Sequence, residues 1–506
     1  MTMAFPVSSC TFLQHNEPHL LVHRKPGQCH LRNAAEISKP QVAMGDISEF
    51  CALIKSSGKS LAAASRCGGL KNSLYSREDT SLLWPLSSST ASGPANRSSV
   101  SIRSTMAGSF DVLERKNLKL SREYTLTDSQ VSTAKSAFDA FIRSVATNPE
   151  RREGAYPYYL LHKPGEKVYG TVLFFHGFSN RPDQMWRLAQ YLFDNGFNVY
   201  QPSIHNHYLL NPDKNWAQVD LKPQWKGPIR QKFLNDPVLK AAIDGIGSIN
   251  NVTDQQTAYI LQRVHALSPD MDDIVEAIND GDYSDKFKKY YDSSHLAYVE
   301  DAEARLKECE SLPGPAFTIG LSVGGSVALG LAAHRPDKIA KVVAYAPLLK
   351  QIGEARRQAT LIAGPLDVKE SGWDPKLQFT VGCYAATDVF GNHVLKEAGK
   401  IAPVPTFLML TENDDSADID TNKNFTSQLK QLSGNSGTPH LQSMYTADMR
   451  VPHPMVDPIE VSQGMTNRYW VTLYQETFRF LTEGTVNDGQ LKRTTPDPSL
   501  PKVPPV

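Results

Sequence analysis

The residues best suited to covalent chemistry form the segment 320–324, Gly-Leu-Ser-Val-Gly. It follows the apolar run 316–319 and precedes a predicted helix from Ser326 to His334. A sharp strand-to-helix turn with this Gly-x-Ser-x-Gly pattern exposes a serine above a sheet edge, and its glycines let the backbones approach closely. The helix N-terminus then supplies positive potential where negative charge develops. We therefore predict that Ser322 is a nucleophile, in preference to a serine that merely caps a helix.

A serine hydroxyl needs a general base, and the base needs an orienting carboxylate. Open α/β sheets place such groups at the carboxyl ends of their strands. His453 follows a predicted strand at 442–445, and a proline on each side restricts its backbone. His440 precedes that strand and is therefore expected at the opposite edge. By position, His453 is the predicted base, in preference to a histidine in an exposed loop.

The acid is expected after the predicted strand 406–410, where the chain reads Thr-Glu-Asn-Asp-Asp. Asp414 is the first aspartate there. Asp415 and Asp418 stand close by, so the pattern alone leaves three candidates.

The segment His-Gly-Phe at 176–178 follows the buried apolar run 170–175. A chain reversal there can aim the backbone N–H of Phe178 into the site, where it would form an oxyanion hole with the N–H of Val323. His176 itself is expected to be structural, as most histidines at strand ends are.

Strands and helices that alternate must position these residues. Strands are predicted at 156–161, 170–175, 197–200, 316–319, 342–345, 406–410 and 442–445, and helices at 183–195, 293–309, 326–334 and 470–481. The continuous apolar runs are typical of strands buried on both faces. This order predicts an α/β protein with a mostly parallel central sheet and helices on both faces. The stretch 205–291 interrupts the alternation and reads as a helical insert, either ordinary core or a cap over the site.

The two ends differ in composition from the middle. Residues 1–106 are rich in serine, poor in acidic residues and without sustained periodicity. This composition predicts a disordered extension and resembles a transit peptide of the chloroplast type, so we expect a plastid location, or a cytoplasmic one otherwise. Residues 107–485 are expected to form the folded domain, and the proline-rich residues 486–506 a disordered tail.

Overall composition limits the classes of partner. Lys and Arg number 53 and Asp and Glu 53, so the formal net charge is +0 and gives no general attraction to nucleic acid. No apolar run is long enough to predict a membrane span. His205 and His207 are weak evidence for a zinc site, because no cysteine or clear third ligand lies near them. The 6 cysteines are scattered along the chain. We therefore expect no cofactor and no metal, and the oligomeric state is left open.

With the order Ser, acid, His, the chain resembles the α/β-hydrolase family, and more narrowly its monoacylglycerol-lipase and esterase-like members. The resemblance covers about residues 156–481. It implies an α/β-hydrolase fold with Ser322 as nucleophile, His453 as base, and Phe178 and Val323 as oxyanion donors. The family usually has Gly-x-x-Asp at the acid, and aligning Thr411 with that glycine selects Asp414. The usual short glycine-rich turn after the fourth strand is replaced by the helical insert.

The first functional hypothesis is a serine hydrolase that cleaves a carboxylic ester through an acyl-enzyme. The alternatives are a thioesterase or acyltransferase, and a non-catalytic module that keeps the fold to bind a ligand. A small-molecule or lipid ester is the expected substrate class.

Overall fold

A computed structural model describes residues 120–240, 254–366, 369–371 and 377–494, all within one compact unit, residues 103–506. The predicted extension, residues 1–106, lies outside the described residues and stays a prediction. In the described ranges, no helix is both long and apolar enough to cross a membrane.

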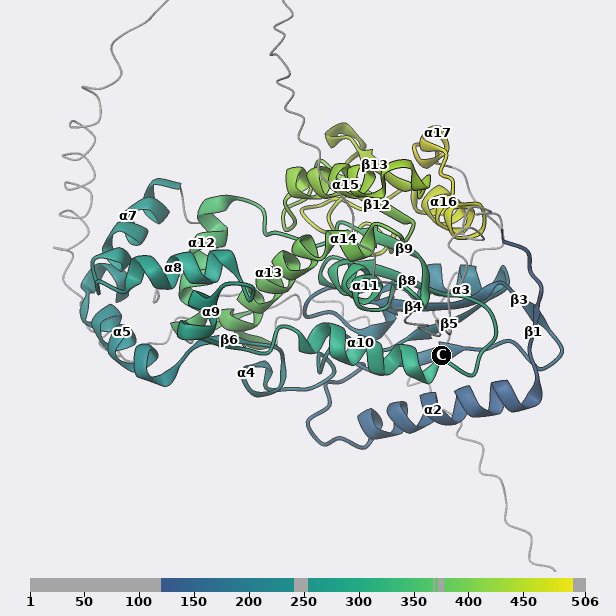
Figure 1. Ribbon diagram of the computed structural model, residues 1–506, viewed down its shortest axis with the longest axis horizontal. Coiled ribbons are helices and arrows are strands. Elements are labelled where there is room, and N and C mark those ends of the chain that lie inside the picture. The colour runs from purple at the N-terminus through teal and green to yellow at the C-terminus, as the bar shows by residue number, and fades with distance from the viewer. Residues whose placement is uncertain (1–119, 241–253, 367–368, 372–376, 495–506) are drawn as a thin grey trace, which may run out of the picture. The chain divides into compact units, whose positions relative to one another are not determined.

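A seven-stranded sheet with the order β13-β12-β9-β8-β4-β5-β2 forms the centre of this unit (Figure 1). Neighbouring strands from β13 to β5 run parallel, and β2 pairs antiparallel with β5 at the edge. The strands are β2 (Tyr158–Leu160), β4 (Gly170–Phe175), β5 (Phe197–Gln201), β8 (Ala316–Leu321), β9 (Ile339–Tyr345), β12 (Thr406–Thr411) and β13 (His440–Tyr445). Every residue of β4, β5 and β12 is buried, as expected for strands covered on both faces.

Helices cover both faces of the sheet. One apolar core packs α3 (Trp186–Asp194), α16 (Trp470–Glu483) and α17 (Asp488–Leu491) against it. The other core joins α2 (Asp128–Ala146), α10 (Ala297–Glu308), α11 (Val323–His334), α14 (Ala398–Ile401) and α15 (Ile419–Ser433). The helix α2 begins with a capping box between Thr127 and Gln130. These layers confirm the predicted α/β architecture, a mostly parallel central sheet with helices on both faces.

The described residues of the predicted insert, 205–291, are mostly helical, and a second segment of the chain joins them. The first segment holds α4 (Pro212–Asn215), β6 (Val219–Leu221), α5 (Pro223–Asn235), α7 (Asp254–His265), α8 (Met271–Asp280), α9 (Asp285–Tyr290) and β7 (Tyr291–Ser293). The second, between β9 and β12, holds α12 (Glu354–Ala363), η4 (Gly364–Leu366), β10 (Lys369–Ser371), β11 (Gln378–Thr380) and α13 (Val381–Lys396). Because α12 contacts α7 and α8, and η4 contacts α5 and β6, the two segments form one cap (Figure 1).

Short elements complete the unit. They are β1 (Tyr124–Thr125), which pairs with β3 (Lys167–Val168), and the 3-10 turns η2 (Pro182–Met185), η5 (Gly434–Ser436) and η6 (Ala447–Met449). The predicted tail boundary at 485 is too early, because α17 lies beyond it. Leu491 is fully buried there, and its carbonyl accepts a hydrogen bond from Thr472 Oγ1.

Candidate active site

Ser322 occupies the sharp turn between β8 and α11. Its backbone angles, φ 58° and ψ −121°, lie in a region that non-glycine residues rarely adopt. Such a conformation costs about 1–3 kcal/mol and persists only where the surroundings hold it. The backbone N–H of Ser322 donates to Tyr345 O at 2.9 Å, and its carbonyl accepts from Gly325 N at 2.9 Å. The side chain is therefore fixed at the carboxyl end of the central strand.

The glycines around Ser322 allow this turn through close backbone approach. A Cβ on Gly320 would lie 2.0 Å from Gly324 O, and a Cβ on Gly324 would lie 1.9 Å from Phe175 O. Neither position can accept a larger residue without displacing backbone. Steric contact with the backbone therefore explains why glycine stands at positions 320 and 324 of the Gly-x-Ser-x-Gly pattern.

His453 and Asp414 meet in the loops that follow β13 and β12. His453 Nδ1 lies 2.8 Å from Asp414 Oδ1, and both side chains are buried. A parallel bridge between Asn413 and Pro452 and a 2.6 Å hydrogen bond from Thr411 Oγ1 to Val451 O join the two loops. The pairing leaves Nε2 as the ring nitrogen available for proton transfer.

The three aspartates that the sequence left as candidates have three different environments. Asp414 Oδ1 also accepts backbone N–H groups of Ser416 (2.9 Å) and Ala417 (2.7 Å). Asp415 accepts instead from Gln463 Nε2 at 2.7 Å, and Asp418 caps α15 by accepting from Thr421 N at 2.8 Å. Only Asp414 is placed against the imidazole.

The electrostatics of His453 favour the imidazolium form. Burial of the ring lowers the pKa of His453, but the neighbouring charge and contact of Asp414 outweigh it, so the pKa lies above its ordinary value. Asp415 and Glu460 add smaller contributions in the same direction. A raised pKa makes the ring a stronger base toward a serine hydroxyl.

The turn at Gly177 and Phe178 faces Ser322. A Cβ on Gly177 would lie 3.6 Å from Ser322 Cβ. The Gly177 N–H donates to Gln184 Oε1 at 2.7 Å, whereas no hydrogen bond in the described part takes up the Phe178 N–H. Val323 is the first residue of α11, so its N–H has no acceptor within the helix. Phe178 and Val323 therefore each have a backbone N–H without an acceptor in the described part of the chain.

Three residues that the sequence did not single out, Asn180, Gln184 and Glu460, lie behind this turn. Gln184 Nε2 donates to Glu460 Oε2 at 3.1 Å, and Asn180 Nδ2 donates to Glu460 Oε1 at 3.2 Å. Burial, with a smaller effect of Asp457, raises the pKa of Glu460 to about 7. No sequence signal could have found Gln184 and Glu460, because they lie in η2 and in the distant loop before α16 and belong to no spacing pattern.

A cavity of about 680 Å³ contains both Ser322 and His453 in its lining. Its volume falls in the range of small-molecule sites. The aromatic residues of the lining come partly from the cap: Phe178 meets the rings of Phe379 and Tyr384 at 4.9 and 5.2 Å between centroids. The remaining lining is largely polar: Ser179, Asn180, Gln184, Arg356, Asp415, Ser416, Ser462 and Gln463.

The other histidines singled out in the sequence have structural partners. His176 is buried between Gly177 O and Ile204 N, and burial lowers its pKa to about 3. His207 stacks on Trp216 at 3.7 Å, and neither it nor His205 belongs to a metal-binding group within the described ranges. His440 bonds to Thr406 Oγ1 at the amino end of β13, the edge opposite the site.

Comparisons with known proteins add a likeness of structure alone. No protein-family model matches the chain, and no curated protein matches it. A metagenome-derived lipolytic enzyme is 13% identical, with a TM-score of 0.39, over 65% of this chain and 98% of its own. A soluble variant of monoglyceride lipase from Saccharomyces cerevisiae is 16% identical, with a TM-score of 0.38, over 67% and 95%. Monoacylglycerol lipase from Paleococcus ferrophilus is 12% identical, with a TM-score of 0.38, over 65% and 99%.

Proposed function

We propose that this protein is a serine hydrolase that cleaves a carboxylic ester through an acyl-enzyme on Ser322. The observation that carries the proposal is the shared cavity. Ser322, held in a rare backbone conformation, and His453, paired with Asp414, both line it. A hydroxyl, a base and an orienting carboxylate are the parts that acyl transfer requires.

In the first half of the reaction, Ser322 Oγ attacks the ester carbonyl carbon and its proton passes to His453 Nε2. Asp414 stabilises the imidazolium and fixes the ring through Nδ1–H. The negative charge on the carbonyl oxygen is met by the N–H groups of Phe178 and Val323. Collapse of the tetrahedral intermediate breaks the bond to the alcohol, which leaves with the proton from His453.

In the second half, water attacks the Ser322 ester and gives its proton to His453 Nε2. The acid is released as the serine recovers its proton, so the enzyme returns to its starting state. Both halves use the same base and the same oxyanion donors, which explains why one compact site is sufficient.

The lining of the cavity supports an amphiphilic substrate. The rings of Phe178, Phe379 and Tyr384 offer an apolar wall suited to an acyl chain or an aromatic acid. Arg356 and Gln463 in the same lining can meet a polar alcohol or acid group. A lipid-derived or other amphiphilic ester fits this mixed lining better than a uniformly polar one.

A thioester substrate would use the same machinery, since the leaving group alone differs. A purely binding role predicts that Ser322 has no more reactivity than a free serine. The strained turn at Ser322 argues against that role, because strain of this kind is concentrated at functional sites.

The test is hydrolysis of a panel of p-nitrophenyl esters and matching thioesters of increasing acyl length by the full chain. We expect turnover with an initial burst when deacylation is slow, and higher kcat/KM for medium or long acyl groups than for acetate. Ser322→Ala is the inactive control. Absence of turnover on every member by a folded sample would contradict the proposal.

A further inference from the structure

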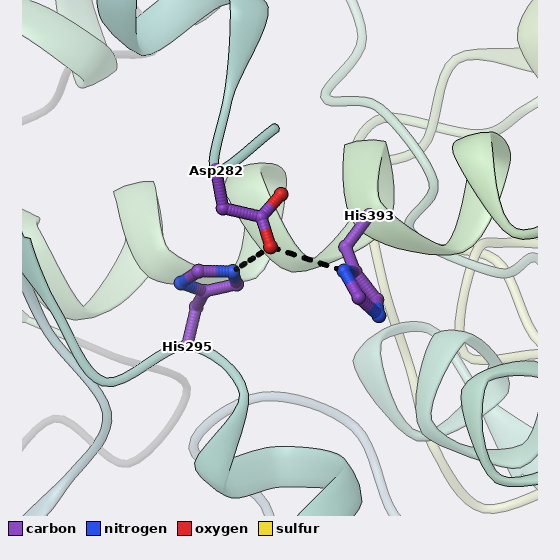
Figure 2. A group of neighbouring side chains, drawn as sticks. All are labelled: Asp282, His295 and His393. Carbon is purple, nitrogen blue, oxygen red and sulfur yellow. Dashed lines mark hydrogen bonds and ion pairs between the residues drawn. The ribbon is translucent and has the colours of Figure 1, made fainter. Parts of the chain in front are cut away.

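A second group of buried imidazole and carboxylate side chains lies outside the catalytic cavity. Asp282 comes from the loop between α8 and α9, His295 precedes α10, and His393 lies on α13 (Figure 2). Asp282 Oδ2 lies 3.1 Å from His295 Nε2 and 3.1 Å from His393 Nδ1. None of the three residues lines the catalytic cavity.

The distances suit a common metal ion. The three ligand atoms lie within 4.8 Å of one another. Two atoms about 2.0–2.1 Å from one tetrahedral zinc ion lie roughly 3.3–3.4 Å apart, close to the two 3.1 Å separations here. Their side chains are 16%, 4% and 9% exposed for Asp282, His295 and His393, so bulk water does not surround the group.

Hydrogen bonding within the group is incomplete. His295 Nε2 and His393 Nδ1 both lie against the same oxygen, Asp282 Oδ2, whereas Asp282 Oδ1 has no hydrogen-bond partner in the described part of the chain. Buried polar atoms of this kind are costly unless they are paired or bind a metal. A cation between the three side chains would satisfy the imidazole lone pair and the carboxylate together.

The outer ring nitrogens have the partners that metal-bound histidines usually have. His295 Nδ1 lies 2.7 Å from Ser293 Oγ, and the Ser293 hydroxyl donates to the carbonyl of Gln218. A hydroxyl used in this way accepts from His295 Nδ1–H, which leaves the Nε2 lone pair facing Asp282.

A similar chain runs outward from His393. His393 Nε2 lies 3.3 Å from His334 Nε2, and His334 Nδ1 lies 3.4 Å from Glu303 Oε1. An imidazole chain that ends on a carboxylate can hold His393 in the tautomer with a free Nδ1 lone pair.

The loop that carries Asp282 is anchored to α13 by further contacts. Asn392 Nδ2 donates to Asp280 O at 3.0 Å, Lys396 Nζ donates to the same carbonyl, and Tyr283 donates to Glu397. The loop is therefore presented to His393 in one orientation. The group lies where the first cap segment meets α13 and the start of α10.

From this geometry we propose that Asp282, His295 and His393 bind a zinc ion that joins the two segments of the cap to each other and to the start of α10. Two nitrogen ligands disfavour calcium and magnesium, which prefer oxygen. Zinc accepts imidazole and carboxylate and imposes little geometry of its own, with water completing the coordination. The role is structural, because the group is separate from the catalytic cavity.

The experiment uses the full chain, stripped with a chelator and then titrated with Zn²⁺ alone and with Co²⁺ as a spectroscopic probe. We expect about one ion per chain, a visible absorption of the intensity typical of four-coordinate Co²⁺, and a rise in Tm of about 3 °C or more with excess zinc. His295→Gln and His393→Gln should each lower zinc affinity at least tenfold, following the loss of a ligand.

His205→Gln is the matched control, because it alters a histidine of the cap that the structure places outside this group. It should keep the affinity of the native chain. If a substitution prevents folding, Asp282→Asn replaces it, with circular dichroism to verify the fold. A folded native chain that neither binds zinc nor gains stability from it overturns the proposal, and so does equal loss of binding in His205→Gln.

Discussion

Two buried carboxylate–imidazole groups in this protein have similar parts and different surroundings. At Asp414 and His453, one carboxylate oxygen meets one imidazole, and the ring also lines a cavity shared with Ser322. At Asp282, one oxygen lies between two imidazoles, and none of the three side chains lines that cavity. We infer that the group an imidazole faces on its second side decides its chemistry. A nucleophile on that side favours proton transfer, and a second buried imidazole favours a metal ion.

The largest effect is expected from Ser322→Ala. It removes the atom that accepts the acyl group, so kcat on an activated ester should fall on the order of 10⁵-fold or more. Zinc binding should be unchanged, because Ser322 is not part of the second group. Steady-state kinetics and a zinc titration on the same sample check both. Substantial residual turnover would contradict a catalytic role for Ser322 with His453 and Asp414.

Asp414→Asn should reduce kcat on the order of 10⁴-fold, because the imidazolium loses its partner and the ring its tautomer. Asp415→Asn is the matched control, since Asp415 bonds to Gln463 instead of His453. We expect a loss of less than tenfold there, well below the loss in Asp414→Asn. A large loss confined to Asp415→Asn would transfer the role of acid to the next residue.

The pH dependence should report the environment of His453. The base must be unprotonated, so kcat/KM should fall as the pH drops through the pKa of His453, which lies above the ordinary value of about 6.5. Asp414→Asn removes the main contribution that raises this pKa, so the acidic limb of its residual activity should move to lower pH. An acidic limb of the native kcat/KM profile with its midpoint at or below pH 6 would contradict the pairing of His453 with Asp414.

A smaller effect is expected from the residues behind the turn at Gly177 and Phe178, where we propose one of the oxyanion donors. Gln184→Ala removes the acceptor that holds Gly177 N–H, so kcat should fall about tenfold, less than the 10²–10³ typical of losing an oxyanion donor. Glu460→Gln should cost less, because one of its two amide contacts can remain. Measuring kcat and KM separately distinguishes positioning of the Gly177 turn from substrate binding. Loss of positioning lowers kcat and leaves KM nearly unchanged.

The sequence predicted the fold because the buried strands are continuous apolar runs, and the sheet of β4, β8, β9 and β12 confirms it. The position of Ser322 could be predicted because its turn requires glycines at fixed spacing. The Gln184–Glu460 contact could not be predicted, since amide–carboxylate pairs between distant loops have no periodicity. For the same reason the sequence did not predict the group of Asp282, His295 and His393, which are far apart in the chain. The second cap segment was missed because its contacts to α7 and α8 exist only in the tertiary structure.

Covalent labelling with a fluorophosphonate probe tests whether Ser322 is an activated nucleophile. We expect the folded native chain to be labelled on Ser322, located by mass spectrometry, and Ser322→Ala not to be labelled. Labelling of Asp414→Asn should be much slower, because the base is poorly oriented. Absence of label on the folded native chain, or label on a different serine, would show that Ser322 is not the nucleophile.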